Sequence, residues 1–311
     1  MSAFDEIQRL LQDKAECQAR INLIPYDGSP EVKENSSGKY LYIRKRIGSR
    51  LTSTYVGVYS EELYQLLLRN AKELRELKKN IRKIDNKLID LGYISTMLEP
   101  RIIKNLDFAR ANMKANIYDQ AVLEGVATSF PQTEDIIDNG TVNGMTATDI
   151  QKILNLKYAW EFILDSDVIQ AKSDYYLLCH IAKLVNEGFF IDGGRIRSVP
   201  VSIGGSTYKP PPPIESYVKE RIDEILNSEK DTIDIAIELC MYCMKTQVFL
   251  DGNKRASVIF ANHYLIAHGQ GFLVIPEEYV SEFKKKLIAF YEGEEMSVIS
   301  EFLKRNCWKT F

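Results

Sequence analysis

The chain has 311 residues, enough for one sizeable hydrophobic core and a smaller second domain, and its hydrophobic and charged fractions of 45% and 27% are those of a globular protein. The net charge of −3 argues against a protein that coats nucleic acid over its whole surface. Five cysteines without framework spacing, no signal-peptide hydrophobic region and no apolar run long enough to cross a bilayer lead us to expect a cytoplasmic protein without membrane contact.

The first 94 residues are expected to form a domain of their own. Residues 3–21 place apolar side chains at mostly helical spacing, which predicts an amphipathic helix. Residues 25–38 contain prolines and glycines among polar residues and are interpreted as a loop. Residues 39–58 are rich in strand-forming side chains on both sides of Gly48-Ser49, a pattern typical of a β-hairpin.

The tip of this predicted hairpin is basic. Its cations are Arg44, Lys45, Arg46 and Arg50. They would suit a nucleic-acid contact, but charges also protect the edges of solvated hairpins, and we favour that simpler role.

One long helix is expected from residue 61 to about residue 91. Its apolar side chains recur at alternating intervals of four and three residues, which predicts a heptad seam of about four repeats. The seam consists of Leu63, Leu67, Asn70, Leu74, Leu77, Ile81, Ile84, Leu88 and Leu91. Asn70 favours a two-stranded pairing of fixed register. Two pairings fit equally well: a homodimer through this arm, or antiparallel packing against the first helix of the same chain.

Residues 95–311 are expected to form a second, mainly α-helical domain. Helical periodicity recurs along it, and strand signal is confined to residues 195–203. The expected helical stretches are 99–123, 147–164, 174–186, 214–226, 232–245 and 281–305. Glycines bound the segment Gly193 to Tyr208, which precedes the run Pro210 to Pro213 and predicts one small β-hairpin.

The strongest functional signal lies in residues 246–257, which read TQVFLDGNKRAS. The apolar stretch that follows predicts a buried helix, so Asp251, Gly252 and Asn253 would lie at its N-terminus. Free backbone N–H groups and the helix dipole attract anions there, and Lys254 and Arg255 add positive charge. The stretch therefore predicts a phosphate-binding loop.

The same stretch resembles the motif of the Fic (Fido) family, H-x-F-x-[D/E]-G-N-[G/K]-R. Phe249 and residues 251–255 occupy the family's positions in register, while Gln247 stands in place of the family's histidine. The resemblance covers roughly residues 95–311 and implies a Fic-type helical domain with a small β-hairpin flap.

The resemblance also implies an activity. Fic adenylyltransferases transfer AMP from ATP to a Ser, Thr or Tyr hydroxyl of a target protein with the help of Mg²⁺. By position, Asp251 would hold the metal, and the backbone N–H groups of Gly252, Asn253 and Lys254 would bind the anion. Asn253 and Arg255 would contact phosphate oxygens, and Arg255 and position 247 would be the catalytic positions.

Gln247 cannot act as a base, because an amide does not titrate near neutral pH. Losing general-base help costs about 10²- to 10⁴-fold, so weak or absent activity is expected. His180, His263 and His268 read as packing or surface residues rather than as replacements. An engineered substitution would explain Gln247 equally well. Two alternatives follow: a Fic-related phosphotransferase, and a nucleotide-binding pseudoenzyme that acts as an interaction or DNA-binding regulator.

Residues 193–208 resemble the family's flap, which holds the target protein by strand addition beside the nucleotide. The resemblance implies that this segment docks the target. The docking residues would be Arg197, Ser198, Val199, Val201 and Ile203.

Residues 120–125 resemble the family's inhibitory helix, with Glu124 and Gly125 in register and Gln120 in place of a hydroxyl residue. In the family that glutamate pairs with a second motif arginine, whose position here is Val258. Without that partner a buried carboxylate would lack compensation. The alternative is an ordinary helix end closed by Gly125.

Overall fold

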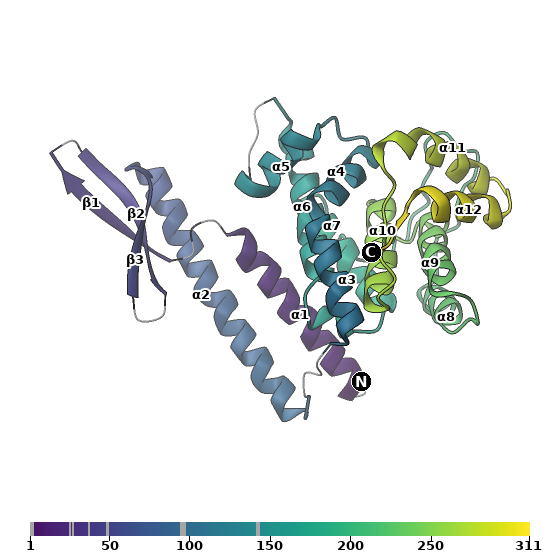
Figure 1. The fold of residues 1–311 in the computed structure, drawn as a ribbon, viewed down its shortest axis with the longest axis horizontal. Helices are drawn as coiled ribbons and strands as arrows, with labels where there is room; N and C mark the ends of the chain where they lie inside the picture. Colours follow the sequence, from purple (N-terminus) through teal and green to yellow (C-terminus); the bar gives the residue numbers. More distant parts are fainter. Residues whose placement is uncertain are drawn as a thin grey trace. The chain divides into compact units, whose positions relative to one another are not determined.

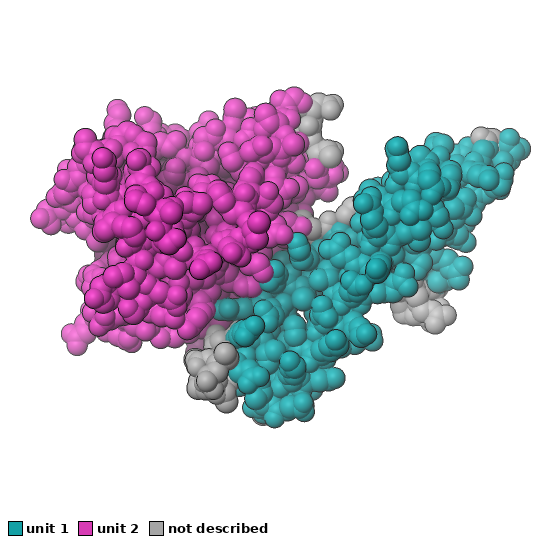
Figure 2. All heavy atoms as spheres, turned by 180° about the vertical axis from the view of Figure 1, so that it is seen from behind, with its two compact units in different colours: residues 1–94 teal, residues 95–311 magenta. Residues whose placement is uncertain are grey.

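The computed structural model describes residues 3–24, 26, 28–36, 38–47, 50–93, 98–140 and 144–311. The chain separates into two compact units, Met1–Ile94 and Ser95–Phe311 (Figure 2). Helices dominate the described residues, as the sequence predicts, and the larger of the two β-sheets belongs to the first unit. Within the described chain, no helix combines the length and the apolar character needed to span a bilayer.

Two long helices form the frame of the first unit, α1 (Ala3–Leu23) and α2 (Glu61–Asp90). They pack antiparallel (Figure 1): Leu10 and Leu11 of α1 form a buried cluster with Leu88 of α2, and Lys14 Nζ lies 3.1 Å from the Asp85 carboxylate. Every residue of the predicted heptad seam is buried or half-buried. The structure therefore shows the seam engaged within the chain, the second of the two pairings considered.

The sheet of the first unit has three antiparallel strands in the order β1-β2-β3: β1 (Ser29–Asn35), β2 (Gly38–Ile47) and β3 (Arg50–Val58). The predicted hairpin is present as β2 and β3, although its Gly48-Ser49 turn lies outside the described residues. Leu41 and Ile43 of β2 pack against Leu67 of α2.

The interpretation of residues 25–38 as a loop was wrong, because they contain β1. Most side chains of this edge strand are polar and exposed, so the stretch lacks the apolar alternation that marks a half-buried strand.

The second unit is organised around α10 (Asn253–Ala267), whose residues are buried along almost its whole length. Helices α9, α7, α6 and α3 contact it. The bounds of the surrounding helices are α3 Pro100–Ala111, α4 Met113–Leu123, α5 Phe130–Asn139, α6 Ala147–Ile163, α7 Tyr175–Val185, α8 Glu215–Leu226, α9 Thr232–Thr246, α11 Val280–Tyr291 and α12 Met296–Asn306. Two 3₁₀ turns, Val168–Gln170 and Glu277–Tyr279, and a two-stranded pair, β4 (Phe272–Leu273) with β5 (Trp308–Lys309), complete it.

The structure differs from the sequence expectation at four places in this unit. The stretch 99–123 is divided at Asn112 into α3 and α4, the stretch 281–305 is divided into α11 and α12, and α5 was not predicted. The stretch 195–203 forms no β-hairpin; its one bridge joins Ile196 with Phe249, outside any named strand. The flap segment, residues 195–203, is therefore an extended stretch of backbone that is attached to the loop at Phe249. It does not form a pair of strands.

His263 lies inside the core of this unit. Its Nδ1 is 2.7 Å from Ser173 Oγ, and its Nε2 is 2.8 Å from the carbonyl oxygen of Val168. Burial lowers the pKa of His263 to about 4, so the ring is neutral at physiological pH. Its role is packing, as the sequence suggested.

Candidate functional site

The site is built where α9 ends and α10 begins. Gln247 caps α9 in the left-handed conformation, with φ 49° and ψ 61°, and Gly252 precedes α10 with φ 74°. A positive φ is uncommon for a residue with a side chain, so the backbone at Gln247 is held by its surroundings. Two left-handed residues therefore bracket the short loop that the sequence predicted to bind phosphate.

Asn253 closes this loop. Its Oδ1 accepts a hydrogen bond from the backbone N–H of Phe249 at 2.9 Å, and its Nδ2 donates to the carbonyl oxygen of Phe249 at 2.8 Å. Nδ2 also lies 3.2 Å from Gln247 Oε1. The amide is thus engaged within the loop itself, and a contact of Asn253 with phosphate stays a prediction. Phe249 is buried and anchors the loop in the core.

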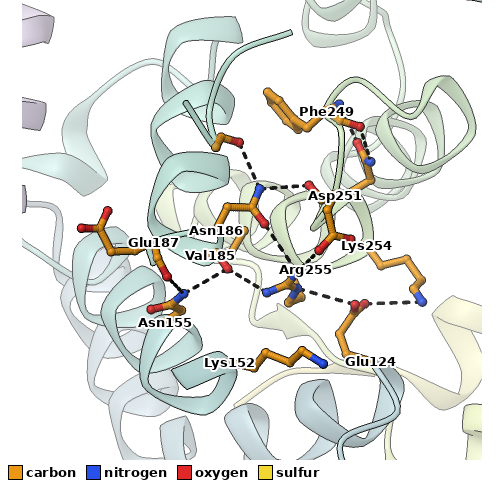
Figure 3. A network of polar contacts seen from close by, with 12 residues as sticks. Glu124, Lys152, Asn155, Val185, Asn186, Glu187, Phe249, Asp251, Lys254 and Arg255 are labelled. Atoms are coloured by element: carbon orange, nitrogen blue, oxygen red, sulfur yellow. Dashed lines mark hydrogen bonds and ion pairs between the residues drawn. The ribbon is translucent and has the colours of Figure 1, made fainter. Parts of the chain in front are cut away.

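Asn186, at the end of α7, ties the loop to the rest of the domain. Its Nδ2 donates to the carbonyl oxygens of Asp251 at 2.9 Å and of Gly193 at 3.0 Å (Figure 3). A Cβ at position 252 would lie 2.7 Å from Asn186 Oδ1, and the φ there is left-handed, so only glycine fits. No sequence pattern points to Asn186, because it lies about 65 residues from the loop that it holds.

Arg255 is almost fully buried, with 2% of its side chain exposed. Its Nη1 donates to the carbonyl oxygen of Val185 at 2.7 Å, and its Nη2 lies 3.1 Å from the Asp251 carboxylate. The guanidinium that was expected to contact phosphate is therefore already engaged by the protein. Arg255 holds the ends of α7 and of the loop together (Figure 3).

Glu124 pairs with the motif. One carboxylate oxygen lies 3.5 Å from Arg255 Nε, and the other lies 3.5 Å from Lys254 Nζ (Figure 3). The expectation that this carboxylate would lack a cationic partner was wrong: the first motif arginine and Lys254 supply the charge that a second arginine at position 258 would have supplied. Both contacts are long, and among the described residues Glu124 Oε1 and Arg255 Nε form no hydrogen bond.

Gln120 fixes the helix that carries Glu124. Its Nε2 donates to the carbonyl oxygen of Arg255 at 2.9 Å, and its Oε1 accepts from Trp160 Nε1 at 3.0 Å. All three groups are buried. Because this bond joins α4 directly to α10, Glu124 is held at a defined place beside the motif, and Gly125 ends the helix just beyond it with φ 80°.

A pocket of ≈ 420 Å³ opens beside the loop. It is lined by Glu124, Ser202, Ile203, Gly204, Gln247, Asp251, Gly252, Asn253, Lys254, Lys284, Leu287, Ile288 and Tyr291. The first intrahelical bond of α10 runs from Ala256 N to Gly252 O at 2.9 Å, so the preceding N–H groups of the helix have no partner in the helix. Lys284 forms no ion pair within the described part of the chain. Unpaired N–H donors and two lysines make the pocket suited to an anion.

Asp251 lies at the rim of this pocket with 56% of its side chain exposed. No group of three or more metal-ligating side chains occurs among the described residues. A single exposed carboxylate still fits Mg²⁺ in a nucleotide site, because that ion keeps several waters and takes its other ligands from the phosphates.

Gln247 reaches the pocket but is held by the protein. Its Nε2 donates to the carbonyl oxygen of Met244 at 2.6 Å, and its Oε1 accepts from Asn253. Its side chain also forms a hydrogen bond with the hydroxyl of Tyr291. Burial raises the pKa of Tyr291, so this phenol also stays protonated at neutral pH. Neither group supplies a proton acceptor.

The flap segment is attached to the loop by Arg197. This side chain is 4% exposed and donates to the carbonyl oxygens of Gln247 and Pro211, and to that of Val199 at 2.7 Å. Arg197 is therefore a structural anchor, which corrects its assignment as a docking residue. Ser198 and Val199 are exposed, Val201 is half-buried, and the half-buried Ile203 lines the pocket.

Two segments of the chain match known protein families. Residues 172–265 match the model of the Fic/DOC family, and residues 4–65 match that of a domain of unknown function, DUF6788. Proteins named protein adenylyltransferase Fic from Drosophila grimshawi and Drosophila erecta are 24% and 26% identical over 200 and 201 residues. Each alignment covers 61% of this chain and 41% or 40% of the relative, so the chain spans about two fifths of their length.

Solved structures show the same fold. Residues 134–508 of Fic-1 from C. elegans superpose with a TM-score of 0.51 at 19% identity, covering 79% of this chain and 76% of that chain. A Fic domain containing signaling protein from Bacteroides thetaiotaomicron superposes with a TM-score of 0.52 at 16% identity, covering 67% and 85%.

Proposed function

We propose that this chain, whose residues 172–265 match the Fic/DOC family model, is a protein adenylyltransferase of low intrinsic activity, which transfers AMP from ATP to a hydroxyl group of a target protein. The observation that carries the proposal is the pocket at the start of α10, where unpaired N–H groups, Lys254 and Lys284 surround a space of ≈ 420 Å³. That volume lies in the range typical of pockets for small molecules and cofactors.

Different residues of the pocket would bind different parts of ATP. The N–H groups at the start of α10 and the positive end of its dipole bind phosphate oxygens, and Lys254 and Lys284 offset their charge. Asp251 provides an oxygen ligand for Mg²⁺, which, when bound, neutralises charge on the phosphates. Leu287 and Ile288 of α11 offer an apolar wall for the base.

Transfer forms a bond between the hydroxyl oxygen of the target and the α-phosphorus, and pyrophosphate leaves. The hydroxyl must also lose its proton, and Gln247, at the position that lines the pocket, cannot accept it. The pocket can therefore position the reactants without general-base help. This is the physical reason for proposing slow transfer.

Glu124 further restrains the site in the state described. Its carboxylate lies between Lys254 and Arg255 and lines the same pocket as Lys254, so it competes with phosphate for the charge of Lys254. We therefore assign Glu124 an inhibitory role, with Gly125 as the end of the helix that presents it.

The target would dock along the outer part of the flap segment. Ser198 and Val199 are accessible there, and Val201 and Ile203 continue toward the pocket. Because Arg197 fixes this segment to the loop, a bound peptide would lie at a defined distance from the phosphate site.

Incubation of the full chain with a cell extract and ATP labelled at either the α- or the γ-phosphate tests the proposal. Label that appears on protein from α-labelled ATP alone supports adenylyl transfer. Label from γ-labelled ATP alone would instead establish the phosphotransferase. No label from either, together with measurable ATP binding, would establish the nucleotide-binding pseudoenzyme. Gly252→Ala serves as the inactive control, since its Cβ would collide with Asn186.

A further inference from the structure

The charges of this chain are unevenly divided between its two units. The whole chain has 40 Lys and Arg and 43 Asp and Glu. Residues 1–94 contain 17 of the basic and 13 of the acidic side chains, so the first unit carries +4 and the second −7. The net charge of the whole chain is weakly negative although the first unit is basic. A polyanion would be attracted to that first unit alone.

The described cations of the sheet are largely neutralised within it. Lys33 and Arg44 lie 3.7 Å and 3.9 Å from the carboxylate of Glu31, and Lys39 lies 3.7 Å from that of Glu34. Both acids belong to β1, the strand that the sequence did not reveal. These ion pairs fit the simpler interpretation of the hairpin, in which its charges face solvent and protect the edge of the sheet. They leave α2 as a part of the unit with unpaired described cations.

Helix α2 carries an unpaired basic stripe, formed by Lys72, Arg75, Lys79 and Arg82. Their spacing of three, four and three residues places them on one face of the helix, and all four are exposed. None of them forms an ion pair with any residue that the structure describes; Arg75 Nε donates to the carbonyl oxygen of Ala71 at 3.0 Å.

The acidic residues near this basic stripe do not cancel it. Asp85 is taken by Lys14 of α1, at 3.1 Å. Glu73 and Glu76 are exposed and flank the stripe without an ion pair within the described chain. From residue 69 to residue 87 the helix has eight basic and three acidic side chains, so its outer surface stays strongly positive.

The geometry points to a phosphodiester duplex as the partner, and we propose that the basic stripe of α2 binds the phosphate backbone of double-stranded nucleic acid. With a rise of about 1.5 Å per residue, the four cations follow one another about every 5 Å along a rigid rod. An anionic membrane fits less well, because an interfacial helix needs a free apolar face, and the apolar seam of α2 is occupied within the chain.

The contact would be independent of base sequence, since it uses only long, flexible cationic side chains on phosphates. Four phosphate contacts give a slope of about −3.6 in a plot of log K against log salt, which corresponds to a loss of about 10²-fold between 50 mM and 200 mM salt. This binding would be separate from the nucleotide pocket of the second unit.

Fluorescence anisotropy of the full chain with labelled duplexes of about 20 base pairs, at several salt concentrations, tests the proposal. The variant K72Q/R75Q/K79Q/R82Q should bind at least about 10-fold more weakly at low salt and lose most of the salt slope. The variant E73Q/E76Q, on the same helix, should bind more tightly because it removes the flanking acids. Parallel titrations with DNA and RNA duplexes identify which source of phosphodiester is preferred.

The fold of these variants is expected to be intact, since the altered side chains are exposed and glutamine favours helices. Far-UV circular dichroism and the thermal midpoint check this. The sheet variant K33Q/K39Q/R44Q should weaken duplex binding less than the α2 variant. Absence of binding to either duplex at low salt, equal binding by wild type and the α2 variant, or binding only to anionic vesicles would each overturn the proposal.

Discussion

Gln247 stands where the proposed reaction would need a proton acceptor, and an amide cannot supply that chemistry near neutral pH. Gln247 adopts a left-handed conformation, lines the pocket and bonds to Met244 and Asn253. None of these contacts needs a titratable group. The loop therefore accepts an amide where proton transfer would need an imidazole.

Replacing Gln247 with histidine should raise AMP transfer by about 10²- to 10⁴-fold, because an imidazole can take the proton of the target hydroxyl near neutral pH. The measurement is the rate of label transfer from α-labelled ATP. Gln247→Asn, which stays an amide, should give no such gain. If the histidine variant binds ATP normally and labels no faster, the missing base is not what limits the reaction.

Replacing Glu124 with glutamine should tighten ATP binding, because the change frees Lys254 and Arg255 from an anion while keeping the size of the side chain. Isothermal titration with ATP and Mg²⁺ checks this, and we expect a gain of about 5- to 100-fold for one partly buried charge. The control is Glu134→Gln, at an exposed pair with Lys114. Unchanged affinity in Glu124→Gln would remove the inhibitory role.

The buried imidazole of His263 should make the protein less stable in mild acid. Its pKa is about 4 in the folded state and 6.5 in an ordinary environment, so the unfolded chain binds the extra proton first as pH falls. The loss of stability begins below about pH 6.5, is complete near pH 4 and amounts to about 3 kcal/mol at most.

Asp119 acts in the opposite direction over part of that range, because burial raises its pKa to about 6 and its contribution is lost as pH rises through that value. The test therefore compares two proteins: the free energy of unfolding of wild type and of His263→Gln is measured with denaturant between pH 7 and pH 4, and the two pH profiles are subtracted. The glutamine amide is polar and does not titrate in this range, so the profile of this variant should lack the His263 component. Identical profiles would contradict the assignment.

At the scale of elements, the flap segment and the α9–α10 loop behave as one piece. Arg197 joins them through carbonyl groups on both sides, and the Ile196–Phe249 bridge adds a backbone contact. The flap is thus positioned by a buried side chain rather than by strand pairing of its own.

Replacing Arg197 with alanine should destabilise this region, since each buried carbonyl left without a donor costs about 1–3 kcal/mol. Denaturant unfolding measures the total, and hydrogen exchange at residues 196–203 locates it. Arg195→Ala is the matched control, because Arg195 is exposed and two residues away; it should change stability by less than about 0.5 kcal/mol. Equal effects of the two variants would show that Arg197 is not an anchor.

Elements with strong local patterns were predictable from the sequence. The heptad spacing identified the buried face of α2, and the apolar run after Arg255 identified α10. Elements held by distant contacts were not: β1 is a polar edge strand, and α5 is a short helix without a strong apolar pattern. The same holds within the site: the motif identified the loop, and the resemblance pointed to Glu124 and to the segment that contains Arg197. It could not show that Asn186 and Arg197 hold the loop through hydrogen bonds from other parts of the chain.

At the scale of the whole molecule, each unit has its own buried contacts. In the first, α1 and the sheet cover successive parts of the seam of α2. In the second, helices surround α10. The seam that offered a dimerisation surface in the sequence therefore has partners inside the chain.

We accordingly expect the protein to be a monomer of 35.7 kDa in light scattering at micromolar concentration. Asn70→Leu provides a sharper test. In a dimeric coiled coil, removing a polar seam residue changes the oligomeric state, whereas in the intrachain pairing it should alter only stability. A mass near twice the monomer, shifted by Asn70→Leu, would favour the dimer.

The bonds by which Asn253 closes the loop bear on which side chains position 247 can carry. Two of the three side-chain bonds of Asn253 go to the backbone of Phe249, so these two bonds do not depend on the side chain at position 247. Codons for glutamine and histidine differ only in their final base. A single nucleotide change at this codon would therefore replace the amide of residue 247 with an imidazole, while the two bonds between Asn253 and Phe249 could stay as they are.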